Sequence, residues 1–166
     1  MNRNKYKVLV LSNLEGRNAK ETLKYGIDVC KEIDGALELF CVKKPREVVT
    51  TDNPLSAMRR VNKSYIETSE KAKSLIREIT KDEFFAVKTT IEFGNVKNEI
   101  EHYIASLNPD VIILGERQKR FFRLNTDSLT NFITKKYTNK VFITNKNNVV
   151  DVAISLNQIK TKGQSA

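Results

Sequence analysis

The sequence predicts an α/β protein in which one parallel sheet of five strands carries helices on both faces. Short apolar runs alternate with longer segments of helical period along most of the chain. Several of these runs are continuous rather than alternating, as expected of strands that are covered on both sides. Crossovers between such strands are expected to be right-handed, and the order 3-2-1-4-5 would place the third strand at an edge. The 166 residues suit one domain with a sizeable core.

The first strand and helix are expected over residues 7–13 and 18–33. "KVLVLSN" is the apolar run of the strand. Asn18 and Glu21 have the spacing of a capping box, which places the start of the helix at Asn18. Gly35 is expected to close the helix in the left-handed conformation. The inward stripe consists of Leu23, Ile27, Cys30 and Ile33.

The second strand is expected at residues 36–42, "ALELFCV", and a long helix follows a polar connection. The helix begins at Asn53-Pro54, where proline is tolerated in the first turn, and runs to about Lys81. Its apolar spacing is weakest at residues 62–64, where a bend is expected.

The third strand, residues 83–94, alternates between apolar and polar side chains, which is typical of a strand at a sheet edge. Asn95 then caps a helix that ends before Asn108-Pro109. A fourth strand at 110–115, a helix from 126 or 127 to 137 and a fifth strand at 140–145 complete the predicted domain, residues 1–146. Residues 147–166 are a polar tail that could add a strand at the sheet edge.

Composition narrows the function classes. No apolar run approaches the roughly 18 residues that span a membrane, and the apolar part of the N-terminus is too short for a signal peptide, so a cytoplasmic protein is expected. The net charge is +9; residues 109–166 carry 10 basic and 4 acidic residues, net +6, against 19 and 16, net +3, before them. This excess favours an anionic partner or a solvated basic surface.

No set of residues predicts catalysis or metal binding. Cys30 and Cys41 lie in apolar contexts and are expected to be buried, and His102 is the only histidine. The chain shows no paired carboxylates or activated nucleophile, so a non-enzyme is expected. A ligand of such a sheet is expected where the strand order reverses, between the ends of strands 1 and 4, at Ser12-Asn13 and Gly115.

The run "FGNVKNEIEHYIASLNPDVIILGERQ", the strand end "LFCV" and the "DSL" before the last strand resemble the universal stress protein family. The resemblance covers about residues 5–145. It implies an adenine nucleotide alpha hydrolase-like fold, a role in the stress response and homodimers that pair through the last strand, here 140–145. A sheet edge is a natural template for such pairing, with the tail as a further contact.

In nucleotide-binding members an Asp after strand 1 and a backbone Val after strand 2 hold adenosine, and a G-x-x-G-x9-G-[S/T] loop holds the phosphates through close backbone N–H groups. Asn13 stands at the Asp position and Val42 at the backbone contact. Gly115 and Ser128 keep the ends of the loop, whereas Gln118 and Asp127 replace its other glycines and the spacing is one residue short. The chain therefore resembles members that do not bind ATP.

Three functions stay open at this point. The first is a homodimeric stress protein that acts through protein contacts, without a cofactor. The second is binding of ATP, AMP or another anion in a modified loop lined by Ser12, Asn13, Val42, Gly115, Arg117, Gln118 and Ser128. The third is nucleic-acid binding through the basic and aromatic loop 117–123, "RQKRFFR", which equally suits phenylalanines tucked onto the sheet.

Overall fold

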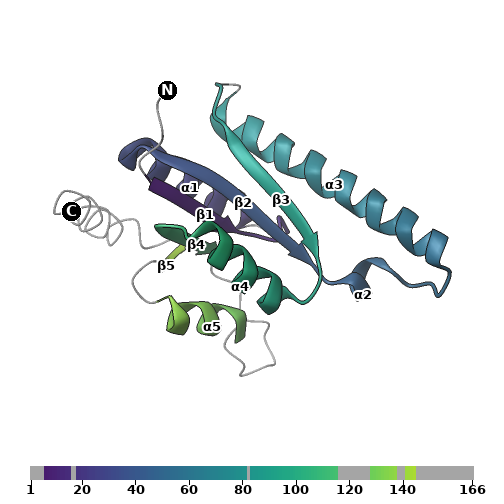
Figure 1. Ribbon diagram of the computed structural model, residues 1–166. Coiled ribbons are helices and arrows are strands. Elements are labelled where there is room, and N and C mark those ends of the chain that lie inside the picture. Colours follow the sequence, from purple (N-terminus) through teal and green to yellow (C-terminus); the bar gives the residue numbers. More distant parts are fainter. Residues whose placement is uncertain (1–5, 16–17, 82, 116–127, 138–140, 145–166) are drawn as a thin grey trace.

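The computed structural model describes residues 6–15, 18–81, 83–115, 128–137 and 141–144. Strands and helices alternate through this part of the chain (Figure 1). The elements are β1 (Tyr6–Leu11), α1 (Ala19–Ile33), β2 (Gly35–Lys43), α2 (Pro45–Val48), α3 (Pro54–Thr80), β3 (Val87–Phe93), α4 (Val96–Leu107), β4 (Val111–Gly115), α5 (Ser128–Lys136) and β5 (Val141–Thr144).

The strands form one parallel sheet in the order β3-β2-β1-β4-β5. β1 lies at the centre, and Val8 is opposite Leu37 of β2 and Val111 of β4. The predicted α/β class with a parallel sheet is confirmed.

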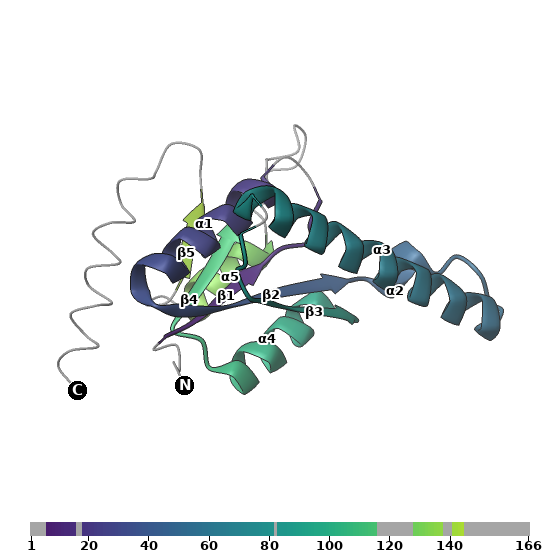
Figure 2. The same cartoon turned by 90° about the horizontal axis from the view of Figure 1, so that it is seen from above.

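Helices cover both faces of the sheet, as predicted. Val8 and Val10 of β1 belong to a core shared with α1 and the C-terminal half of α3, whereas Leu9 and Leu11 belong to a core shared with α4 and α5. Figure 2 shows α1 and α3 on one side of the sheet and α4 on the other. Because every second residue of β1 faces the opposite side, its apolar run has to be continuous.

The ends of α1 differ from the prediction. Asn18 makes no side-chain capping hydrogen bond, so the expected capping box is wrong; its carbonyl oxygen accepts from the backbone N and the Oγ1 of Thr22 instead. At the other end Asp34, not Gly35, is left-handed, with φ of 57°. Gly35 begins β2, where a Cβ would lie 3.0 Å from Cγ2 of Val8. Gly35 therefore lies in close contact with both β1 and α1.

The polar connection after β2 contains the short helix α2, which was not predicted. α3 starts at Pro54 as predicted, with the side chain of Asn53 accepting from the backbone N of Leu55 and of Ser56. It runs uninterrupted through residues 62–64, without the expected bend. The N-terminal half of α3 extends past the end of the sheet (Figure 1).

β3 lies at the sheet edge, as its alternation predicted, but begins at Val87 rather than residue 83. Asn95 caps α4 by accepting from the backbone N of Asn98 at 3.1 Å. Cys30 and Cys41 are buried free thiols, as expected, and His102 is exposed on α4. No helix within the described ranges is long and apolar enough to cross a membrane. The tail 147–166 lies outside the described residues.

Candidate functional site

The predicted ligand site lies at the carboxyl ends of three neighbouring strands, here named the carboxyl edge: Ser12, Asn13, Val42 and Gly115. β2, β1 and β4 are adjacent and parallel, so their ends meet at one edge of the sheet. The backbone N of Ser12 donates to the carbonyl of Phe40 at 3.2 Å, which ties the end of β1 to β2. The structure thus brings together four of the seven predicted residues. Arg117 and Gln118 lie outside the described residues, and Ser128 is the first residue of α5.

The side-chain oxygens of Ser12 and Asn13 fold back onto the backbone. Oγ of Ser12 accepts from the N of Leu14 at 3.0 Å, and Oδ1 of Asn13 accepts from the N of Glu15 at 3.1 Å. These bonds make local turns of the kind that Ser and Asn favour. Leu14 is left-handed, with φ of 61°, and fully buried. Both side chains that were expected to receive a ligand therefore hold the loop that lets Leu14 enter the core.

An ion pair joins this loop to the end of β2 and was not predicted. Nζ of Lys43 lies 3.8 Å from Oε1 of Glu15, and the lysine side chain is only 20% exposed. Burial raises the pKa of the nearby Cys41 thiol to about 11, while Lys43 and Lys71 of α3 lower it and Glu15 raises it. One carboxylate and two ammonium groups thus act on the same region. No spacing in the sequence links Glu15, Lys43 and Lys71.

Gly115 has a packing role at the carboxyl edge. A Cβ at this position would lie 2.5 Å from Oγ1 of Thr22 on α1. Thr22 is buried, and its hydroxyl donates to the carbonyl of Asn18 at 2.8 Å. β4 and α1 therefore meet closely at a residue without a side chain. This glycine is explained by helix–strand contact as well as by the first position of a phosphate loop.

A second polar group lies on the α4 face of the sheet. The hydroxyl of Tyr103 donates to Glu38 and lies 3.2 Å from Oγ1 of Thr90, and its ring stacks on Phe40 with centroids 4.0 Å apart. Burial, and then the hydrogen bond to Glu38, raise the pKa of Tyr103 to about 12. Lys88 lies 3.6 Å from Glu38. This group joins α4 to β2 and β3 and is satisfied within the fold.

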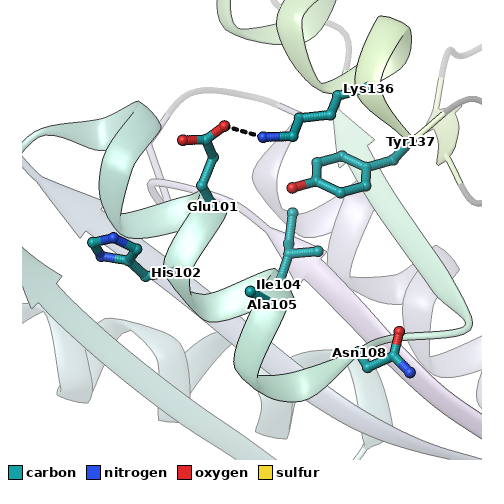
Figure 3. Close-up of a pocket in the computed structure, with 7 residues that line it drawn as sticks. All are labelled: Glu101, His102, Ile104, Ala105, Asn108, Lys136 and Tyr137. Atoms are coloured by element: carbon teal, nitrogen blue, oxygen red, sulfur yellow. Dashed lines mark hydrogen bonds and ion pairs between the residues drawn. The ribbon is translucent and has the colours of Figure 1, made fainter.

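A surface pocket of about 380 Å³ lies between α4 and α5 (Figure 3). Lys136 and Glu101 form an ion pair at its rim, and their hydrogen bond raises the pKa of Lys136. His102 points away from this pair (Figure 3). The last turns of α4 and α5 precede the start of β4 and β5, so the pocket is at the amino end of the sheet. It is therefore remote from the carboxyl edge, and its facing charges neutralise each other.

Taken together, these features define an open, doubly wound α/β protein with polar groups at the point where the strand order reverses, a place where such folds bind ligands. The family model of the universal stress protein family matches residues 7–143. The chain belongs to this family.

Solved structures show the same fold. Universal stress protein UspA from Lactobacillus plantarum is 17% identical, with a TM-score of 0.63 over 87% of this chain and 100% of that one. A universal stress protein from Archaeoglobus fulgidus is 13% identical, with a TM-score of 0.57 over 83% and 92%. A universal stress protein in complex with cAMP is 12% identical, with a TM-score of 0.52 over 84% and 95%. No curated protein sequence matches the chain.

Proposed function

We propose that this universal stress protein works in the cytoplasm as a homodimer that acts in the stress response through protein contacts, without catalysis and without tight ATP binding. One observation supports the absence of tight ATP binding: the side-chain oxygens of Ser12 and Asn13 accept hydrogen bonds from backbone N–H groups in the turn after β1. The sequence adds that Gln118 and Asp127 stand where the family's phosphate loop has glycines. Two like unit charges about 4 Å apart repel by about 1 kcal/mol in water and by about 4 kcal/mol near a protein surface, so Asp127 would disfavour a phosphate held in such a loop.

Non-denaturing mass spectrometry of the freshly purified protein tests both parts. The expected spectrum contains twice the mass of the chain, with no added nucleotide. A monomer at every concentration would contradict the proposed homodimer. A mass increase of one ATP per chain would contradict the proposed absence of tight ATP binding.

The homodimer is proposed to pair through β5, which ends the described sheet. Successive backbone N–H groups of a strand point to opposite sides, so one of Phe142 and Ile143 donates toward β4 and the other away from it. Proline at the outward position removes a hydrogen-bond donor of the dimer and leaves the β4–β5 hydrogen bonds in place, whereas proline at the inward position removes one of those bonds. We expect one of Phe142→Pro and Ile143→Pro to give a folded monomer. If both proline variants are folded and dimeric, pairing through β5 is contradicted.

The effect of Gln118 and Asp127 on ATP binding can be tested by changing both residues to the glycines of the family's phosphate loop. The variant Gln118→Gly/Asp127→Gly restores flexibility and removes a negative charge where phosphate would sit. Calorimetry is expected to show tighter ATP binding than in the wild type, whereas Gln118→Ala, the matched control, changes nothing. Equal ATP affinities for the wild type, the double variant and Gln118→Ala would show that the missing glycines do not account for weak ATP binding.

Binding of a small anion is the second candidate, favoured by the ammonium group of Lys43 next to Val42 of the carboxyl edge, where it also pairs with Glu15. The structure solved with cAMP shows that one protein of the family binds a cyclic nucleotide. Titration of ATP, AMP and cyclic AMP into the protein decides between the two proposals. Binding heat from ATP, AMP or cyclic AMP would favour the anion-binding function if Lys43→Ala abolishes that heat. Absence of heat at high protein concentration would remove it.

Nucleic-acid binding through residues 117–123 stays a prediction, because this loop lies outside the described residues. Single-stranded RNA affinity that falls steeply with salt and with Arg120→Ala would support it. Affinity that Arg120→Ala leaves unchanged would count against it.

A further inference from the structure

We draw no further inference here: the strongest candidate, the patch of exposed apolar side chains on the N-terminal half of α3, Leu55, Met58, Tyr65 and Ile66, carries none, because nothing in the described part of the chain shows what covers this face.

Discussion

Gly115 shows how one residue at the carboxyl edge couples two elements. A Cβ there would lie 2.5 Å from Oγ1 of Thr22, a short, buried side chain with little freedom to move. We expect Gly115→Ala to lower the free energy of unfolding by about 1–3 kcal/mol, as overpacking does. Urea unfolding measures this. In a Thr22→Ala background the same substitution should cost much less, and an equal cost in both backgrounds would show that the two residues are not coupled.

The two thiols give a residue-scale prediction about reactivity. Burial raises the pKa of Cys30 to about 12 and of Cys41 to about 11, so neither forms a thiolate near neutral pH. Alkylation by iodoacetamide at pH 8 is expected to be slower by at least two orders of magnitude in the folded protein than in urea. Rapid labelling of one thiol in the folded state would show that its surroundings open often.

Some features of single residues could be predicted and others could not. Asn13 was expected at a ligand position, but its Oδ1 accepts a hydrogen bond from the backbone N of Glu15. Asn has several partners of similar energy, and the sequence does not choose between a ligand and a local turn. The Glu15–Lys43 pair joins residues from two different strand ends. Such a contact is set by tertiary structure and has no local pattern.

At the scale of elements, α4 depends on its cap. Oδ1 of Asn95 accepts from the backbone N of Asn98, so Asn95→Ala is expected to lower stability by about 1 kcal/mol in urea unfolding. Asn98→Ala is the matched control: its backbone N–H remains, and an exposed substitution should stay within about 0.5 kcal/mol. Similar losses in both variants would mean that the cap does not stabilise the fold.

Most strands and helices could be predicted because burial on one or both faces imposes a period on the sequence. The β1 run is apolar at every position because its two sides face different cores. The ends of the helices were harder to predict. At the end of α1, Asp34 takes the left-handed conformation expected of Gly35, because Asp also tolerates that conformation. α2 has only four residues, too few to show a helical period.

At the scale of the whole molecule, the position of one edge strand could be predicted. The half-polar alternation of β3 indicated a sheet edge, and β3 lies there. The exposure of the N-terminal half of α3 could not be predicted in the same way, because apolar residues at helical spacing continue through both halves of the helix. The sheet lies beside the C-terminal half of α3, and the N-terminal half extends past it (Figure 1).

Alkaline pH should weaken the whole fold, because four groups favour their neutral forms in it. Burial raises the pKa of Tyr25 and Tyr103 from 10.0 to about 12, of Cys30 from 9.0 to about 12 and of Cys41 from 9.0 to about 11. Between pH 9 and about 12 the unfolded chain therefore binds fewer protons than the folded one. Stability that is fully present below pH 9 is lost as pH rises through this range. Other changes in the net charge of the chain with pH also act on stability, so variants have to be compared with the wild type. Comparing variants separates these effects: the urea midpoint of Tyr103→Phe should fall less between pH 8 and 10.5 than that of the wild type. Parallel curves for the two proteins would show that Tyr103 titrates alike in both states.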